Sequence, residues 1–550
     1  MANQTVSGLL FKQMVSNGAV NLKNNRKEID HLNVFPVPDG DTGTNMQMTM
    51  MAGIKQVNNL DSTSIVDISK ILSRGLISGA RGNSGVILSQ FFRGFSDSVS
   101  KLDRESLTID EFVQALLKGA EMAYKVVSVP VEGTILTVVR EAAEKVMAEK
   151  ESFNSLEDCL KTYLEEAKHS LSLTPEKLPV LKEAGVVDSG GAGFIKIIEG
   201  MSLALQGIIL QESLQTESDD IYFGVRNLGD VDIKNAFCTE FIVKLARPEI
   251  FNDANLKDSL MAIGDSLVLV TDEEILKVHV HTNVPGTVLT LAQKFGEIQT
   301  VKIENMRIQH SSIVSSNKEI LEERSKGPKV HTKYTLIAAC QGSGIKETFK
   351  TLGVNYIIDG GQTMNPSTED FLSAINEFDS DHYIILPNNG NVIMAAEQTK
   401  LLLPEKDIRV LKTKTVAQGY SSLIFFDPEG DCDINMAEMG ETLEKVKSGE
   451  ITYSVRNTTL DGMKIKKNDF IGILDGIIKS VNSTRLKCVK DLLGKMIDEN
   501  TQILTIFYGD SVNLDEIDDV VTFAKKSSPD LEVEVVNGNQ AIYSYIFSVE

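Results

Sequence analysis

Apolar side chains recur at a helical spacing along the first part of the chain. The period is close to 3.6 residues in one block marked by Phe112, Leu116, Leu117 and Met122, and in another marked by Leu72, Leu76, Val86, Leu88, Phe91 and Phe92. Glycines gather between the helical blocks, in the stretches 79–85, 132–134 and 188–193. The pattern predicts an all-α helical domain over residues 1–208, with glycine-rich loops between its helices.

The hydrophobic period changes after about residue 222. Residues 237–244, 267–270 and 277–281 have the composition of strands, and residues 286–295 have a helical pattern. A small α+β domain over residues 222–317 is therefore expected. The charged stretch 318–333 is typical of a linker.

Strands and helices alternate from residue 334 onward. The alternation consists of strand-like stretches at 334–339, 356–358, 383–386 and 408–411, and of helical stretches from 344, 371 and 393. This order predicts a parallel sheet with crossover helices, in an α/β domain over residues 334–550. A further strand is expected at 503–508, in a second block after about residue 450.

Length, charge and cysteine content limit the class of protein. A chain of 550 residues exceeds what one hydrophobic core supports, so several domains are expected. The net charge of −22 disfavours a nucleic-acid-binding protein, because phosphates would be repelled. Five scattered cysteines without a C-x-x-C pair indicate a reducing, cytoplasmic compartment. No apolar run approaches the roughly 20 residues that cross a bilayer, so no transmembrane segment is expected.

The segment 33–46 carries the most informative chemistry of the chain. Its sequence places Asp39 and Asp41 around Gly40 in a proline-stiffened turn. Mg²⁺ usually reaches proteins through one or two carboxylates plus substrate phosphates, and glycines let consecutive N–H groups converge on an anion. The segment therefore predicts a site for a magnesium-bound nucleoside triphosphate. The alternative is an ordinary Asp-Gly turn.

Phosphoryl transfer needs alignment and charge neutralisation more than covalent help from the protein. In this interpretation Asp39 and Asp41 hold one or two Mg²⁺ ions, and Asn33 is a neutral oxygen ligand or an outer partner of the metal. Donors to the phosphates would come from Thr42, Gly43, Thr44 and Asn45.

A second glycine loop precedes the apolar run 86–88. Asn83, Ser84 and Gly85 are expected to start a helix there, and a helix N-terminus is a natural anion site. The alternative is a glycine cluster that lets two helices pack closely. Arg81, beside this loop, would either reach a phosphate or be solvated.

Three motifs together resemble the dihydroxyacetone kinase L-subunit family. They are Asp39-Gly40-Asp41-Thr42-Gly43-Thr44-Asn45, Gly82-Asn83-Ser84-Gly85 and Val187-Asp188-Ser189-Gly190-Gly191-Ala192. In that family a barrel of antiparallel helices binds ATP at one end through aspartates that carry Mg²⁺. Two further stretches, Lys277-Val278-His279-Val280-His281-Thr282 and residues 360–367, extend the likeness over the full length to the FakA family of bacterial fatty acid kinases. This resemblance gives the last segment the DegV-like fold of fatty-acid-binding proteins.

The resemblance also implies roles for single residues. Asp39 and Asp41 match the metal ligands of the family, and with Thr42 they are the expected catalytic residues. Asp188 and Ser189 match the loop that closes over the nucleotide, and Thr134 lies where relatives have a helix-start threonine near the phosphates. The dihydroxyacetone enzymes have a further aspartate where this chain has Asn33 at a slightly different spacing, so the third metal ligand stays open.

The implied reaction is the transfer of a phosphoryl group from ATP to the carboxylate of a fatty acid, for phospholipid synthesis. A separate fatty-acid-binding carrier subunit would present the acyl chain, and a homodimer is expected. A fatty carboxylate is already ionised at neutral pH, so it needs no general base. Two alternatives stay open: a kinase for a small polyol such as dihydroxyacetone, and a non-catalytic nucleotide-binding regulatory scaffold.

The middle and last segments carry further candidate sites. His279 and His281 lie two residues apart on a predicted strand and face one side, and with Cys238 they would form a Zn²⁺ site. The alternative is a pair of surface or packing histidines. The loops 360–367 and 387–391 follow predicted strands, where open sheets bind ligands, so they would serve partner docking or be simple tight turns.

Overall fold

The computed structural model describes residues 4–33, 40–102, 105–127, 129–211, 235, 237–248, 251, 253–272, 274–305, 330–361 and 365–550. The chain forms two compact units. One joins Met1–Ser213 to Val330–Glu550, and the other is Leu214–Lys329. The first and last segments of the sequence therefore share one unit, and the middle segment forms a unit of its own.

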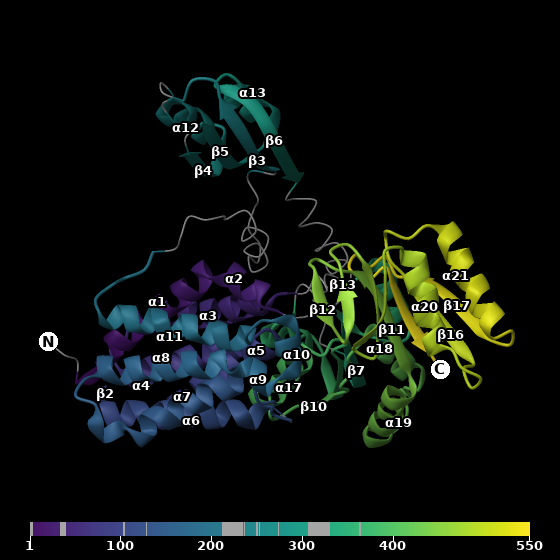
Figure 1. Ribbon diagram of the computed structural model, residues 1–550, viewed down its shortest axis with the longest axis horizontal. Helices are drawn as coiled ribbons and strands as arrows, with labels where there is room; N and C mark the ends of the chain where they lie inside the picture. The colour runs from purple at the N-terminus through teal and green to yellow at the C-terminus, as the bar shows by residue number, and fades with distance from the viewer. Residues whose placement is uncertain are drawn as a thin grey trace. The chain divides into compact units, whose positions relative to one another are not determined.

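The part up to residue 211 is almost entirely helical (Figure 1). Its helices are α1 (Gly8–Asn24), α2 (Arg26–His31), α3 (Thr42–Asn58), α4 (Ile65–Ser78), α5 (Gly82–Val99), α6 (Ile109–Val126), α7 (Ile135–Ala148), the 3-10 turn η1 (Lys150–Ser152), α8 (Leu156–Ser172), α9 (Thr174–Lys177), α10 (Pro179–Ala184) and α11 (Ser189–Leu205). A short antiparallel pair, β1 (Thr5–Ser7) with β2 (Ser106–Thr108), lies beside them. The all-α prediction for this segment is confirmed.

One expected helical block is divided. Leu72 lies in α4 and Val86 lies in α5, and residues 79–81 separate the two helices. Gly79 is the C-cap of α4, and Gly82 has a φ of +59°, which a continuing α-helix does not tolerate. The glycine loop therefore breaks the block in two.

Hydroxyl side chains fix several helix starts in this part. Ser7, Ser64 and Ser155 each accept a hydrogen bond from the backbone N–H three residues further on. Thr108 and Glu111 form a reciprocal capping box at the start of α6. These caps satisfy N–H groups that the helices themselves leave without partners.

The apolar faces of these helices enclose one core. Phe95 stacks on Phe11 with ring centroids 5.1 Å apart, and it meets Phe112 edge-on at 5.7 Å. Phe91 meets Phe194 edge-on at 5.0 Å. The rings come from α1, α5, α6 and α11, so α5 binds together helices that are far apart in the sequence.

The middle unit is a four-stranded antiparallel sheet with two helices. The strand order is β4–β5–β3–β6. The bounds are β3 (Phe237–Leu245), α12 (Asp253–Met261), β4 (Gly264–Asp272), β5 (Ile275–Thr282), α13 (Pro285–Gln293) and β6 (Gly296–Asn305). Val278 and Val280 of β5 are buried with Val288 of α13. The α+β prediction is confirmed.

The last segment begins with a parallel sheet of order β10–β9–β7–β8. Its elements are β7 (His331–Cys340), α15 (Ser343–Thr351), β8 (Tyr356–Asp359), α16 (Thr368–Asn376), β9 (Asp379–Leu386), α17 (Ile393–Leu402) and β10 (Asp407–Val410). The predicted parallel sheet is confirmed. The predicted linker extended too far, because β7 starts at His331, which pairs with Asp379 of β9.

A second sheet, of order β15–β14–β11–β18–β16–β17, follows in the last segment. The remaining elements are α18 (Val416–Ile424), α19 (Cys432–Lys445), β11 (Lys447–Tyr453), β12 (Thr458–Leu460), β13 (Met463–Ile465), β14 (Phe470–Leu474), β15 (Ile477–Asn482), α20 (Arg485–Met496), β16 (Ile503–Tyr508), α21 (Leu514–Ser527), β17 (Glu532–Asn537) and β18 (Tyr545–Val549). The strand expected at 503–508 is confirmed as β16. Only β16 and β17 pair in parallel in this sheet, so the alternating α/β pattern does not extend through it.

The helical part and the last segment share apolar packing within their unit. Ala80 and Val86 are buried in one cluster with Phe371 of α16. Gln398 of α17 donates a hydrogen bond from Nε2 to Ser89 Oγ of α5 at 3.2 Å. This contact brings loops of the last segment to the glycine-rich end of the helices.

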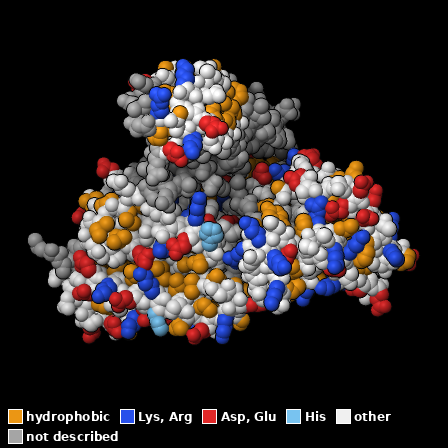
Figure 2. Space-filling view, turned by 45° about the horizontal axis from the view of Figure 1, so that its top comes forward, with side chains coloured by type: hydrophobic (Ala, Val, Ile, Leu, Met, Phe, Trp, Pro, Cys, Tyr) orange, Lys and Arg blue, Asp and Glu red, His pale blue; other side chains and the backbone are white. Residues whose placement is uncertain are grey.

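Acidic and basic side chains lie interspersed over the face drawn in Figure 2. Within the described ranges, no helix has both the length and the apolar character that crossing a membrane requires.

Candidate functional site at the start of four helices

Four helices of the N-terminal part begin at the predicted glycine loops. Their N-caps are Asp41 for α3, Arg81 for α5, Thr134 for α7 and Asp188 for α11. The N-terminus of a helix carries partial positive charge and unsatisfied N–H groups, so it favours an anion. The expectation that Asn83 and Ser84 begin a helix is confirmed, since both lie in the first turn of α5.

These helix starts lie side by side. Ser189 at the start of α11 donates from Oγ to Thr42 Oγ1 at 3.3 Å. A Cβ built on Gly190 would lie 3.2 Å from Ser84 Oγ and 3.2 Å from Ile135 Cβ. Loops that are up to 147 residues apart in sequence therefore meet within the space of one phosphate group.

The carboxylate of Asp41 is not used to cap its own helix. An N-cap side chain normally accepts a hydrogen bond from the second or third helical N–H, but Asp41 makes no such bond. Asp30 of α2 replaces it, because Thr44 donates its backbone N–H to Asp30 Oδ1 at 3.0 Å and its hydroxyl to Oδ2 at 2.9 Å. Asp30 thus satisfies the start of α3, and Asp41 lines a cavity instead.

Burial raises the pKa of Asp30, and the hydrogen bonds from Thr44 oppose that rise. The carboxyl of Asp30 therefore depends on Thr44 to stay ionised. The sequence did not indicate Asp30, because its role appears only when α2 packs beside the first turn of α3.

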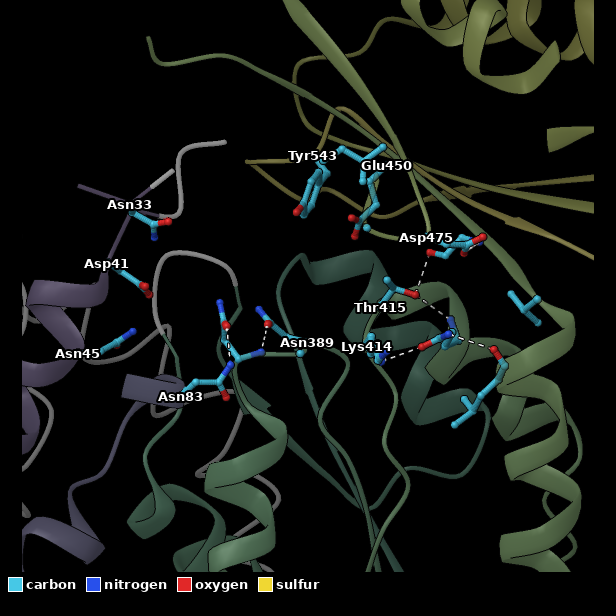
Figure 3. Close-up of a pocket in the computed structure, with 18 of the residues that line it drawn as sticks. Asn33, Asp41, Asn45, Asn83, Asn389, Lys414, Thr415, Glu450, Asp475 and Tyr543 are labelled. Carbon is cyan, nitrogen blue, oxygen red and sulfur yellow. Dashed lines mark hydrogen bonds between the residues drawn. The ribbon is translucent and has the colours of Figure 1, made fainter. Parts of the chain in front are cut away.

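The cavity has a volume of about 630 Å³ and lies between the helical part and the last segment (Figure 3). From the helical part it is lined by Asn33, Asp41, Thr42, Asn45, Asn83 and Ser84. These are all among the residues predicted from the sequence. Asn33 therefore shares the cavity with Asp41, as the proposed third metal ligand requires.

The opposite wall comes from loops of the last segment. Asn391 accepts a hydrogen bond on Oδ1 from Asn83 Nδ2 at 3.2 Å. Asn389 is 5 % exposed, and its Nδ2 has no hydrogen-bond partner in the described structure. Lys414 supplies the cationic side chain among the lining residues. The loop 387–391 thus faces the cavity instead of forming only a tight turn.

A polar network holds the loop before α7. Glu132 accepts hydrogen bonds from Tyr124 (2.9 Å), Thr137 (2.6 Å) and Arg140 (3.0 Å). Burial raises the pKa of Glu132, but these three bonds outweigh it and the net pKa is lowered. Gly133, with a φ of +84°, donates its N–H to the Thr137 hydroxyl at 2.8 Å. The start of α7 is therefore fixed by an ionised carboxylate.

Asp188 caps α11 and is itself perturbed. Its Oδ2 accepts the N–H of Gly191 at 2.7 Å. Burial raises the pKa of Asp188 to about 6, although the backbone N–H groups of Gly191, Ile135 and Gly190 oppose the rise. A carboxyl that protonates this readily places less negative charge beside a bound phosphate.

Three predicted phosphate donors lie between helices and not on the cavity wall. A Cβ on Gly43 would lie 2.5 Å from the carbonyl oxygen of Arg26, and a Cβ on Gly85 would lie 2.4 Å from Thr49 Oγ1. Thr44 is bonded to Asp30. Close helix packing thus explains the two glycines. Their nucleotide-binding roles, and that of Thr44, stay predictions, and Asp39 lies outside the described residues.

Arg81 is neither solvated nor directed at the helix starts. It donates from Nη1 to the carbonyl oxygen of Asn365 at 2.8 Å and lies 3.5 Å from Asp370. Both partners belong to the last segment. Arg81 therefore fixes the loop 360–367, of which residues 362–364 lie outside the described part.

The predicted zinc residues lie on two paired strands of the middle unit. The register pairs Cys238 of β3 with His281 of β5, and Glu240 with His279. The side chains of Cys238 and His279 lie outside the described part, so the zinc site stays a prediction.

Sequence reasoning missed four residues near the cavity. They are Asp30, Asn365, Asn389 and Lys414. Asn365 and Asn389 lie in loops that the sequence had marked as ligand or docking loops, whereas Lys414 follows β10 without any motif. The fold brings them to the helix starts only through contacts between the first and last segments.

Comparison with known proteins gives matches along the chain. A DAK2 domain model matches residues 36–203, and two models of FakA-like fatty acid kinases match the rest: the middle-domain model residues 234–313 and the C-terminal model residues 335–550. Protein YloV of Bacillus subtilis is 43 % identical over 558 residues, which cover 100 % of both chains.

Alignments with solved structures are weak. Dihydroxyacetone kinase from C. freundii in complex with AMP-PNP and Mg²⁺ aligns with a TM-score of 0.29 and 16 % identity, over 36 % of this chain and 34 % of that one. The Streptococcus pneumoniae fatty acid kinase B3 protein, loaded with linoleic acid, aligns with a TM-score of 0.28 and 10 % identity, over 40 % of this chain and 99 % of that one. TM-scores this low carry no argument about function.

Proposed function

Because this chain belongs to the FakA-like family of fatty acid kinases, we propose that it transfers the γ-phosphoryl group of ATP to the carboxylate of a fatty acid held by a separate carrier protein. The products are ADP and an acyl-phosphate for phospholipid synthesis.

The observation that carries the proposal is the convergence of helix starts on Asp41. The N-termini of α3, α5 and α11 meet within hydrogen-bonding distance or van der Waals contact, and α7 begins beside them. Their partial charges favour a polyphosphate at this place. The adjoining cavity of about 630 Å³ is large enough for a nucleotide.

The residues present suit magnesium. Oxygen ligands from carboxylates and amides are those that Mg²⁺ prefers, and Asp41 and Asn33 offer them on one cavity. Asp39, Asp41 and Asn33 would hold one or two ions. When bound, the metal neutralises charge on the phosphates. Thr42, Asn45, Asn83 and Ser84 would hold the phosphate oxygens, and Thr134, Asp188 and Ser189 would close over the nucleotide.

A carboxylate acceptor requires little from the chain. The fatty carboxylate is ionised at neutral pH, so its oxygen attacks the γ-phosphorus directly, the bond to the β–γ bridging oxygen breaks, and ADP leaves. Asp41 and Asp39 serve the nucleotide and not the acceptor in this scheme. The catalytic work of the protein is alignment and charge neutralisation.

A separate carrier is supported by the family description, which gives this kind of chain as one of the kinase's subunits and so implies another. The acyl chain would be delivered by a protein of the fatty-acid-binding type. Zinc at Cys238, His279 and His281, and a homodimer, belong to the same proposal. Metal analysis and sedimentation of the purified chain test these two points, and absence of stoichiometric zinc or a monomeric mass would remove them.

Turnover with different acceptors tests the proposal. The purified chain is incubated with ATP and Mg²⁺, together with oleate-loaded carrier, carrier alone or dihydroxyacetone. Hydroxylamine trapping measures acyl-phosphate, and a coupled assay measures ADP. Acyl-hydroxamate formed only with the loaded carrier supports a fatty acid kinase. Turnover with dihydroxyacetone alone indicates a polyol kinase, and no turnover with any acceptor indicates a regulatory scaffold.

Asp41→Ala should abolish this turnover. Loss of an outer partner of a bound metal already costs about 10–100-fold in activity, so loss of a ligand should exceed about 100-fold. The fold should persist, because Asp41 forms no cap bond with α3. Asp97→Ala, at an exposed position near the other end of α5, is the matched control and should keep full turnover. Near-normal turnover in a folded Asp41→Ala chain would exclude this site.

A further inference from the structure

The loop 360–367 of the last segment crosses to the helix starts. Arg81 and Ser367 form an isolated antiparallel bridge, and Thr368 donates its N–H to the carbonyl oxygen of Ala80 at 3.2 Å. Arg81 donates to the carbonyl oxygen of Asn365 at 2.8 Å. These main-chain contacts fix Asn365 against the N-terminus of α5.

Asn365 meets the carboxylate of Asp41. Its Nδ2 donates to Asp41 Oδ2 at 2.6 Å, and its side chain is fully buried, at 0 % exposure. Gly82 leaves room for this contact, because a Cβ there would lie 3.6 Å from Asn365 Nδ2 and 2.6 Å from Asn45 Nδ2. A hydrogen bond to an ionised carboxylate is about twice as strong as one between neutral groups.

The other polar atom of the amide points to a ligand. Asn365 Oδ1 is buried and accepts no hydrogen bond from any residue that the structure describes. Leaving a buried carbonyl unpaired is costly, and each such atom in a folded protein calls for an explanation. Mg²⁺ usually keeps several bound waters, and such waters are hydrogen-bond donors beside the carboxylate that holds the ion. Asn365 therefore has one group for Asp41 and one that suits a hydrated cation.

We propose that Asn365 is a positioning residue for the metal-binding carboxylate of Asp41, so that the last segment completes the kinase site of the first. This inference rests on the proposed function. Partners that orient a metal-binding group hold it in one geometry and raise the affinity for the metal. The kinase site would then be complete only when the first and last segments are in contact.

Metal affinity, measured without turnover, tests the role of Asn365. Binding of Mn²⁺, used in place of Mg²⁺, to the full chain with a nonhydrolysable ATP analogue is followed by electron paramagnetic resonance. Asn365→Leu keeps most of the buried volume but removes both polar atoms, and we expect about 10- to 100-fold weaker Mn²⁺ binding. In turnover with loaded carrier, the KM for Mg²⁺ should rise by a similar factor.

A matched control separates positioning from loss of the contact between segments. Gln398→Met removes the hydrogen bond to Ser89 across the same contact but does not reach Asp41, so Mn²⁺ affinity should stay unchanged. Should Asn365→Leu fail to fold, Asn365→Ser, which keeps a hydroxyl donor, should bind Mn²⁺ with an affinity between those of the wild type and Asn365→Ala.

The outcomes separate this inference from the proposed function. A wild-type chain without a saturable Mn²⁺ site would overturn both. Wild-type binding that Asn365→Leu and Asn365→Ser reproduce would overturn the role of Asn365 alone. Equal losses in Asn365→Leu and Gln398→Met would also overturn it, because they would show that only the contact between segments matters.

Discussion

Replacing Asp188 by asparagine should change how the stability of the chain depends on pH. Asp188 caps α11, and burial raises the pKa of its carboxyl from the usual 3.8 to about 6 in the folded state. In the unfolded chain the pKa returns to its ordinary value. Between these two values the folded state holds a proton that the unfolded state has lost.

The sign and size of the effect follow from this difference. Stability falls with rising pH wherever the folded state binds more protons. The contribution of Asp188 is therefore fully present below about pH 4 and is lost as the pH rises through about 6. A difference of roughly two pKa units corresponds to about 3 kcal/mol. Asparagine caps helices as well as aspartate does, and it carries no charge at any of these pH values.

We expect Asp188→Asn to be similar to wild type in stability near pH 4 and more stable by up to about 3 kcal/mol at pH 7. The assay is the difference in denaturation midpoint between variant and wild type, measured from pH 4 to pH 7. Asp431→Asn, at the exposed N-cap of α19, is the matched control for the exchange of a capping carboxylate. A difference that stays flat across this pH range for Asp188→Asn would refute the reasoning.

Two further substitutions test the packing around the site and the last segment. Gly82→Ala should cost about 2–4 kcal/mol, because it adds a left-handed backbone cost to a clash 2.6 Å from Asn45 Nδ2. Gly185→Ala, with a φ of +67° and nothing within 4 Å, should pay only the backbone cost of about 1–2 kcal/mol, and equal losses in thermal denaturation would contradict the clash. Arg485→Ala should cost about 3 kcal/mol, because Arg485 makes two 2.8 Å bonds to the partly buried carboxylate of Glu516. The double variant Arg485→Met/Glu516→Leu should lose less in the same measurement, since it leaves no unpaired charge, and a larger loss would contradict that explanation.

Local signals in the sequence sufficed for the helical part of the fold. The periodic apolar residues and the glycine loops predicted an all-α segment, and the structure confirms it. The division between α4 and α5 was missed, because the apolar period continues across residues 79–81 and only the positive φ of Gly82 interrupts the helix.

The second sheet of the last segment was also missed, although a signal for part of it was present. Asp461-Gly462 and Asp475-Gly476 have positive φ values and join β12 to β13 and β14 to β15. Asp-Gly pairs between short apolar runs are strong hairpin signals. The rhythm of strand and helix before residue 450 favoured a parallel sheet and hid these short antiparallel strands.

The candidate site was predicted only on its helical side. Asp41, Thr42, Asn45, Asn83 and Ser84 belong to motifs that are local in sequence, so the pattern could mark them. Asn365 and Lys414 reach the same cavity through packing between distant segments, and no local pattern encodes such packing. Asp30 was hidden for the same reason, since its capping role depends on how α2 lies beside α3.

The chain leaves the unit of the helices after Ser213 and returns to it at Val330, with the middle unit inserted between. The entropy of closing a loop grows only with the logarithm of its length, so each doubling of the insert costs about 0.6 kcal/mol. Evolution could therefore enlarge, exchange or specialise the inserted module with little penalty to the unit that interrupts its sequence to hold it. For protein engineering, the same arithmetic marks this insertion point as a place to graft a sensor or reporter domain.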